Sequence, residues 1–296
     1  MRVLDSHLHL WDPSRLDYPW LEGPLRARFD GQDLLTARGE DAVEHAAVFV
    51  QAACIDEQFL DEVAWVASLA ESIGVRGIVA GARLDQGEQT RRYLDVVAGR
   101  PLVVGVRHLL QGEPVGFALT EAFRAGVHEL VRHGLTFDAC VRGAAQLRDV
   151  IALADAEPEL RIVLDHLGKP VVGTASAPLV PDAEWVDAIS ELAARPQVSC
   201  KLSGLPAEAA GSWSAAQVEP FLDVVATVFG PDRIMIGSDW PVSAVTAEGW
   251  AGGDGPAVDA AAIPTWTRTI AQWADARAFD VDAVLWRNAA RFYGLG

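Results

Sequence analysis

The first residues in the sequence that could do chemistry together are His7 and His9, two positions apart. They follow the apolar pair Val3-Leu4, which begins a predicted buried strand. Because residues i and i+2 of a strand point to the same face, both imidazoles should converge on one spot at the carboxyl end of that strand. Imidazoles bind metals and transfer protons, and the flanking Asp5 favours a functional site over two surface histidines.

Polar residues also end most of the later predicted strands, and these are the candidates to join the histidine pair. They are Gln51, Arg107, His108, Asp138, Asp165, His166, Lys201, Ser203 and Asp239. In a (β/α)8 barrel the catalytic groups come from the carboxyl ends of several strands, so the joint pattern predicts one shared site. Taken singly, Arg107 could instead be a structural ion-pair partner, and Asp239 could cap the element after the eighth strand.

The elements that must position these residues alternate between apolar runs and amphipathic segments. The apolar runs are the stretch that begins at residue 3, then 46–51, 78–80, 102–107, 135–138, 161–166, 198–203 and 233–239. The segments with helical spacing are 57–73, 88–98, 116–133, 143–155, 183–194, 214–229, 263–277 and 280–293. This alternation is typical of parallel βα units. With no linker in between, it predicts one (β/α)8 TIM barrel, a single domain over residues 1–296, of α/β class.

Two longer connections and three tryptophans flank the predicted site. The connections are residues 11–35, rich in Pro, Arg, Asp and aromatics, and the Gly-rich segment 242–262. Long loops in a compact domain are often functional, so 242–262 is interpreted as a loop near the site or a lid. Trp11, Trp20 and Trp240 could each pack in the core or present an apolar face to a bound ligand.

Composition narrows the classes of partner and compartment. The 24 Lys and Arg against 41 Asp and Glu give a net charge of −17, which disfavours nucleic acid and anionic membrane surfaces as partners. The three cysteines, Cys54, Cys140 and Cys200, lie far apart, which fits a reducing compartment. No signal-peptide pattern or apolar run of about 20 residues is present, so we expect a cytoplasmic protein.

Motifs across the chain resemble one known superfamily. They are Asp5-Ser-His-Leu-His-Leu-Trp-Asp-Pro13, Tyr18-Pro-Trp-Leu21, Gly105-Val-Arg-His108, Leu164-Asp-His-Leu-Gly-Lys-Pro170, Lys201-Leu-Ser-Gly204, Gly237-Ser-Asp-Trp-Pro241 and Asn288-Ala-Ala-Arg-Phe-Tyr293. This set resembles the amidohydrolase superfamily and, within it, the sugar-lactonase branch of L-fuconolactonases and L-rhamnonolactonases. The resemblance implies a (β/α)8 barrel that hydrolyses a sugar lactone, and it carries over His7, His9, His166 and Asp239 as the catalytic set.

Lactone hydrolysis needs an activated water and a group that stabilises charge on the carbonyl oxygen. Asp239 is the predicted general base, and imidazoles, a metal or Arg107 could stabilise the oxyanion. The predicted substrate-binding residues are Arg107, His108, Trp11, Trp20, Lys201 and Trp240.

The sequence does not determine whether the protein binds a metal ion. His7, His9 and Asp239 could hold one divalent ion, with Zn²⁺ favoured by the ligand types. Two-metal amidohydrolases add a Lys or Glu on strand four and a His on strand five, where this sequence has Arg107-His108 and Asp138. We therefore expect one ion or none.

Two other functions stay open at this stage. One is a metal-dependent decarboxylase of the same superfamily, although Asp138 replaces the His that such relatives usually carry on strand five. The other is a non-catalytic sugar-acid-binding barrel, which would need no His/Asp cluster. The sequence does not determine the sugar, the ring size, the metal requirement or whether the chain forms a homo-oligomer.

Overall fold

A closed ring of parallel strands forms the centre of the computed structural model, which describes residues 1–39, 44–253 and 257–296. In this part of the chain the main sheet has eight strands in the order β1-β2-β3-β4-β5-β6-β9-β10. Their bounds are β1 Arg2–Leu8, β2 Glu44–Val50, β3 Val75–Gly81, β4 Val103–Arg107, β5 Thr136–Ala139, β6 Ile162–Leu164, β9 Val198–Leu202 and β10 Ile234–Ile236. The strands follow one another around the ring in chain order, as the predicted (β/α)8 barrel requires.

The ring closes just past the ends of β1 and β10. The Asp239 amide donates to the His7 carbonyl at 2.7 Å, and the His9 amide donates to the Trp240 carbonyl at 2.8 Å. These two bonds bring the first and last strand ends together and place Asp239 beside the histidine pair. The barrel fold predicted from the sequence is therefore confirmed.

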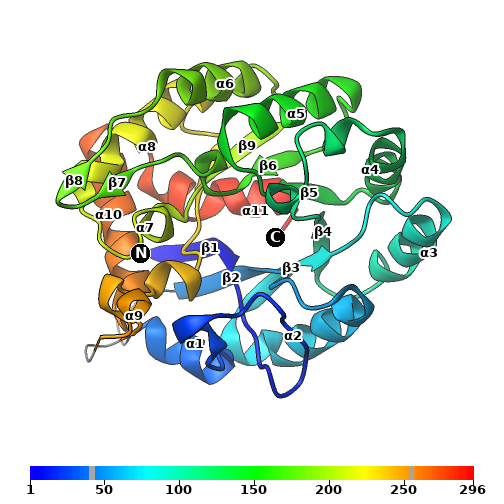
Figure 1. Cartoon of the computed structure of the whole chain (residues 1–296), viewed down its shortest axis with the longest axis horizontal. Coiled ribbons are helices and arrows are strands. Elements are labelled where there is room, and N and C mark those ends of the chain that lie inside the picture. The colour runs from blue at the N-terminus through cyan, green and yellow to red at the C-terminus, as the bar shows by residue number, and fades with distance from the viewer. Residues whose placement is uncertain (40–43, 254–256) are drawn as a thin grey trace.

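Helices surround the strands on the outside of the ring (Figure 1). The longer ones are α2 Phe59–Ile73, α3 Glu88–Val97, α4 Glu121–His133, α5 Gly143–Ala156, α6 Ala183–Ala193, α8 Ala215–Phe229 and α10 Ala262–Ala276. The 116–133 prediction began too early, because Thr120 caps α4 by accepting a hydrogen bond from the Phe123 amide. Gly74 and Gly134 end α2 and α4 in the left-handed conformation that glycine adopts without strain. No helix among the described residues is long and apolar enough to cross a membrane.

The last helix, α11 (Asn288–Tyr293), covers the amino-terminal ends of the strands. Asn288 donates to the carbonyls of Pro231 and Ile234, at 2.7 and 2.8 Å, where β10 begins. Phe292 and Tyr293 pack into the barrel interior among side chains that include Leu4, Val48, Val163 and Met235. With this end covered, an opening remains at the opposite, carboxyl end of the strands.

The loops at the carboxyl end contain short elements. The 11–35 connection holds a 3-10 turn at Gly23–Arg26, and α1 spans Gly31–Ala37. The 242–262 segment includes a 3-10 turn at Val242–Ala244 and α9 at Ala247–Ala251, while its residues 254–256 lie outside the described part of the chain. A small hairpin of β7 (Gly173–Thr174) and β8 (Ala177–Pro178) follows β6.

Candidate active site

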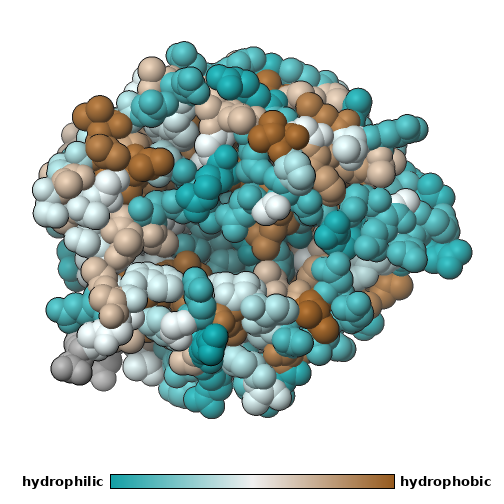
Figure 2. Space-filling model, viewed as in Figure 1, coloured by the Kyte–Doolittle hydropathy of each residue, from teal (hydrophilic) through white to brown (hydrophobic). Residues whose placement is uncertain are grey.

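A cavity of about 350 Å³ lies at the carboxyl ends of the barrel strands. Figure 2 shows this face of the molecule hollowed near its centre. The charged, imidazole and indole side chains that line the cavity are His9, Trp20, Arg107, Arg142, His166, Lys169, Glu208, Asp239 and Trp250. The mix of charged groups with two indoles suits a small polar molecule that has one apolar face.

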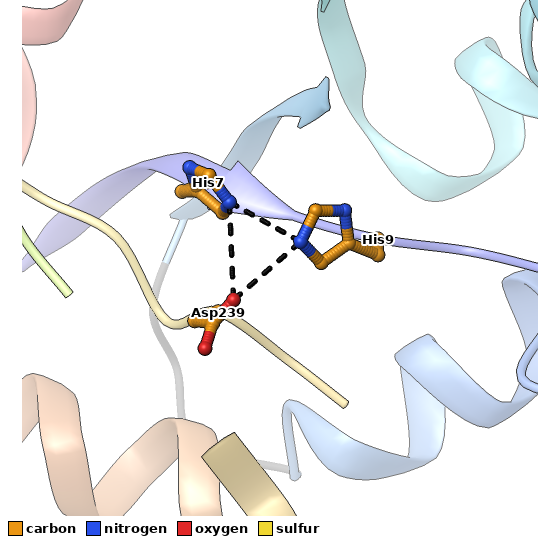
Figure 3. Close-up of side chains that lie close together, drawn as sticks. All are labelled: His7, His9 and Asp239. Carbon is orange, nitrogen blue, oxygen red and sulfur yellow. Dashed lines mark hydrogen bonds and ion pairs between the residues drawn. The ribbon is translucent and has the colours of Figure 1, made fainter. Parts of the chain in front are cut away.

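Three side-chain atoms form a triangle at the floor of this cavity (Figure 3). Nε2 of His7 lies 3.2 Å from Nε2 of His9, and Oδ1 of Asp239 lies 3.8 and 3.4 Å from these two nitrogens. His7 is fully buried, whereas His9 and Asp239 line the cavity. The predicted convergence of residues 7 and 9 on one spot is therefore what the structure shows.

Both histidines are held through their second ring nitrogen. Nδ1 of His9 is 2.8 Å from the carbonyl oxygen of Val50 at the end of β2. Nδ1 of His7 is 3.1 Å from Oδ1 of Asp165 and 3.0 Å from Nζ of Lys201. Such bonds fix the orientation of each ring and leave both Nε2 atoms directed at Asp239.

Asp239 is held by its own backbone and by a hydroxyl. Its φ of 55° lies in the left-handed region, a strained conformation for a side-chain-bearing residue and a common one at functional sites. The Ser243 hydroxyl donates to Oδ2 at 2.8 Å, so Oδ1 is left to face the imidazoles. Burial by itself would raise the pKa of the Asp239 carboxyl, but attraction by the neighbouring imidazoles, His166 foremost, holds that pKa below its usual range.

His166 approaches the same carboxylate oxygen from the end of β6. Its Nε2 is 3.7 Å from Oδ1 of Asp239, and its Nδ1 is 2.9 Å from the Ser203 hydroxyl. A Cβ on Gly204 would lie only 2.5 Å from Nδ1 of His166, so the ring can occupy this place only because residue 204 is glycine. Burial lowers the pKa of His166 to about 3, so the ring is neutral at ordinary pH.

A layer of buried charges lies beneath His7. Lys201 contacts Asp138 Oδ2 at 2.5 Å and Asp165 Oδ1 at 3.0 Å, and Arg107 reaches Asp165 Oδ2 at 3.5 Å. Burial opposes ionisation of both carboxyls. It raises the pKa of Asp138 to about 6, whereas attraction by the Lys201 ammonium outweighs burial at Asp165 and holds the Asp165 pKa well below its usual range. Two cations and two carboxyls thus balance one another inside the barrel.

The residues predicted to bind substrate do not all reach the cavity. Trp20 and Arg107 line it, and the Trp20 indole is fixed by donation to the Ala52 carbonyl at 2.7 Å. Lys201 is fully buried, because it lies inside β9 rather than past its end. His108 faces an adjoining space, where its Nε2 is 3.2 Å from Oε1 of Glu113.

Trp11 and Trp240 lie in the core beside the site. The Trp11 indole is fully buried and donates to the carbonyls of Leu25 and Ala27 at 3.0 and 2.9 Å. Trp240 stacks edge-on against Phe29, with ring centroids 5.6 Å apart. Of the two readings left open for these tryptophans, the structure places both in core packing, where they support the loops around the cavity.

Four charged or aromatic residues line the cavity without having been singled out from the sequence. Arg142 and Glu208 form an ion pair with contacts of 2.7 and 3.0 Å across the rim. Lys169 follows His166 within the same motif, and Trp250 lies on α9 in the segment expected to be a lid or site loop. Motif position could have indicated Lys169, and the 242–262 expectation could have indicated Trp250. Nothing in the spacing of Arg142 and Glu208 signals their contact.

The triangle of His7, His9 and Asp239 fits a divalent ion by distance. A tetrahedral zinc with bonds of roughly 2.0–2.1 Å holds its ligand atoms roughly 3.3 Å apart. The three separations here are 3.2, 3.4 and 3.8 Å. Two neutral imidazoles and a carboxylate are also a donor set that zinc accepts, and the three atoms form one of the two candidate metal-binding groups among the described residues.

Comparison with known proteins identifies the family. A family model described as Amidohydrolase matches residues 4–295. The chain belongs to the amidohydrolase family. It is 31% identical over 306 residues to an L-fucono-1,5-lactonase of Burkholderia multivorans, an alignment that covers 99% of this chain and 96% of that protein. An L-fucono-1,5-lactonase of Burkholderia ambifaria is 32% identical over 250 residues, which covers 81% of this chain and 80% of that one.

A solved structure agrees with this assignment. An amidohydrolase from Burkholderia multivorans with bound zinc superposes with a TM-score of 0.79 at 30% identity, covering 100% of both chains. The resemblance read from the sequence motifs is thereby confirmed. As a member of this hydrolase family with lactonase relatives, the chain is an enzyme of the hydrolase class.

Proposed function

We propose that this amidohydrolase opens a five- or six-carbon aldonolactone to the free sugar acid, with lactones of the L-fucono and L-rhamnono type as the first candidates. The observation that carries the proposal is Oδ1 of Asp239, which lies at the cavity floor within 3.8 Å of Nε2 of His7, His9 and His166. The lactonase relatives support the reaction class, and the cavity supports a ligand of this size.

In the proposed reaction a water held beside Asp239 attacks the lactone carbonyl carbon. Asp239 accepts a proton from that water as the new C–O bond forms. The carbonyl oxygen becomes negative, and the neutral His166 ring and the Arg107 guanidinium stabilise it from the cavity wall. The ring C–O bond then breaks, and the proton held by Asp239 passes to the departing ring oxygen. Lactone and water thereby give the hydroxy acid and regenerate the carboxylate.

The cavity walls match the two sides of a sugar ring. The indoles of Trp20 and Trp250 offer apolar faces for the ring carbons, and Arg142, Lys169 and Glu208 offer partners for the hydroxyls. This division supports a sugar lactone as the first candidate substrate.

For the metal, we propose at most one divalent ion, zinc by preference, held by His7, His9 and Asp239. When bound, such an ion supplies Lewis acidity that lowers the pKa of a coordinated water. A second group of donor atoms, His7, Asp165 and His166, shares His7 with the first. Asp165 in that group already pairs with Lys201, which leaves a second ion without a free carboxylate. Metal analysis that finds two tightly bound equivalents per chain would contradict this proposal.

A pH-indicator assay against a panel of aldonolactones tests the proposed function. The panel should include both ring sizes, L-fucono and L-rhamnono forms with their stereoisomers, an amide and a phosphodiester, each with an enzyme-free blank. We expect acid release from at least one sugar lactone well above the blank. Acid release only from the amide or phosphodiester, or release of CO₂ from an aromatic acid with no lactone turnover, would overturn it. The second result would support the decarboxylase alternative.

A further inference from the structure

The buried ammonium of Lys201 lies within hydrogen-bond distance of three side-chain atoms. Asp138 Oδ2 lies at 2.5 Å, Asp165 Oδ1 at 3.0 Å and His7 Nδ1 at 3.0 Å from Nζ. A lysine ammonium has donors and no acceptor. An imidazole nitrogen that accepts from it carries no proton, and we take Nδ1 of His7, 3.0 Å from Nζ and 3.1 Å from Oδ1 of Asp165, as this acceptor.

The position of the proton on the neighbouring His9 ring follows from its contact with β2. Nδ1 of His9 lies 2.8 Å from the Val50 carbonyl oxygen, which can only accept, so His9 carries its proton on Nδ1. In a neutral His9 ring Nε2 is then the accepting nitrogen, and Oδ1 of Asp239 lies 3.4 Å from it. The same nitrogen faces Nε2 of His7 at 3.2 Å, and a neutral His7 without a proton on Nδ1 carries one on Nε2. The bonds run in a single direction from Lys201 through His7 and His9 to the Val50 carbonyl.

The Asp165 carboxylate does not reverse the direction of the hydrogen bonds from Lys201 to Val50. Its Oδ1 is 3.1 Å from Nδ1 of His7, which would suit a proton on that nitrogen. However, Oδ1 already accepts from Lys201 at 3.0 Å, and Oδ2 faces Arg107 at 3.5 Å. A proton on Nδ1 of His7 would point at the Lys201 ammonium, and the third N–H of Lys201 would have no acceptor, which is costly in a fully buried group.

We propose that Lys201 is a positioning residue that fixes His7 as the tautomer protonated on Nε2 and thereby weakens divalent-ion binding at His7, His9 and Asp239. The Nε2 proton of His7 points into the triangle shown in Figure 3, the place an ion would occupy. Binding an ion through Nε2 requires that proton to move to Nδ1, against Lys201. A proton and an ion therefore compete for Nε2 of His7, and the hydrogen bond from Lys201 favours the proton.

The tautomer can be observed directly. Long-range ¹H–¹⁵N spectra of chelator-treated enzyme labelled on histidine nitrogen distinguish protonated from bare ring nitrogens, and the spectrum of His7→Gln identifies the His7 signals. We expect a bare Nδ1 and a protonated Nε2 on His7 at pH 7. A protonated Nδ1 on His7 in the wild-type enzyme would overturn the proposal, and this measurement needs no variant of Lys201.

Zinc affinity gives an independent readout. In Lys201→Met/Asp138→Asn the buried cation and one buried carboxylate leave together, so the charge balance beneath His7 is kept. We expect the His7 proton to move to Nδ1, where Asp165 accepts it, and zinc to bind about 10- to 100-fold more tightly in competition with a chelator. The control Asp138→Asn keeps the Lys201–His7 bond and should keep the wild-type tautomer. An unchanged zinc affinity in the folded double variant would contradict the proposal. Neither experiment uses a lactone, so failure here is separate from failure of the proposed function.

Discussion

The hydroxyl of Ser243 donates a 2.8 Å hydrogen bond to Oδ2 of Asp239, the carboxylate at the floor of the cavity. Ser243 lies in the 3-10 turn Val242–Ala244, and its amide also donates to the Asp239 carbonyl at 2.9 Å. Two contacts from one residue therefore fix both the backbone and the side chain of Asp239. The free oxygen, Oδ1, is directed at the imidazoles as a consequence.

Asp239→Asn should leave the fold intact and lower kcat about 10²- to 10⁴-fold, the usual cost of losing a general base. Asparagine keeps the shape and can still accept from Ser243, but it cannot take a proton from water. KM should change little if Asp239 acts only on the water. The measurement is kcat on the best lactone of the panel, with circular dichroism to show folding. A folded variant with near wild-type kcat would remove Asp239 from the mechanism.

Ser243→Ala should lower kcat about 10-fold or more while the protein stays folded. A hydrogen bond to a charged group contributes about 1.5–3 kcal/mol, and its loss lets the carboxylate rotate away from the attacking water. Ser68→Ala is the matched control, because the Ser68 hydroxyl donates to the Trp65 carbonyl on the exposed side of α2, away from the cavity. Equal activity of the two variants would show that Ser243 does not orient Asp239.

The pH dependence of kcat/KM should be flat between about pH 5 and 8. The pKa of Asp239 is held below its usual range, so the base stays ionised throughout this interval. The pKa of His166 is lowered to about 3, so that ring stays neutral. Initial rates at low substrate concentration across the interval measure this. An acidic limb centred within it would contradict this expectation and show that a group other than Asp239 and His166, such as Asp138 with its pKa of about 6, controls the rate.

The buried carboxyl of Glu62 should make the stability of the fold depend on pH. This fully buried carboxyl accepts from the Ala52 amide at 3.0 Å, and burial raises its pKa from 4.5 to about 7. An acid with a raised folded-state pKa stabilises the fold below its unfolded pKa, and this stabilisation is lost as pH rises from 4.5 to about 7. The loss amounts to about 3 kcal/mol.

Glu62→Gln should remove this loss, because glutamine keeps an acceptor for Ala52 and never ionises. Relative to wild type, its Tm should therefore rise between pH 5 and pH 8. Glu71→Gln, an exposed site on the same helix, is the control and should show the wild-type pH dependence. Parallel Tm curves for wild type and Glu62→Gln would contradict the assignment of this pH effect to Glu62.

The sequence by itself determined the barrel and many of the residues at the floor of its cavity. Continuous apolar runs, typical of parallel strands buried on both faces, alternated with segments of helical period 3.6. Polar residues at the ends of those runs had to meet at one rim, because parallel strands in a barrel end together. His7, His9, His166 and Asp239 could be placed near one another on that basis alone.

Only the tertiary structure decided how far below the cavity each side chain lies in the barrel, and which segments around the strand ends contact one another. Lys201 and Arg107 both belong to barrel strands, yet one lies beneath His7 and the other lines the cavity, because their heights in the barrel depend on strand stagger. The Arg142–Glu208 pair joins residues 66 positions apart, one directly before α5 and the other at the end of the short helix α7 (Leu205–Glu208). Such contacts arise from how loops fold back over the strand ends, and no local period in the sequence encodes them. The direction of the hydrogen bonds from Lys201 to Val50 likewise became visible only once the distances were known.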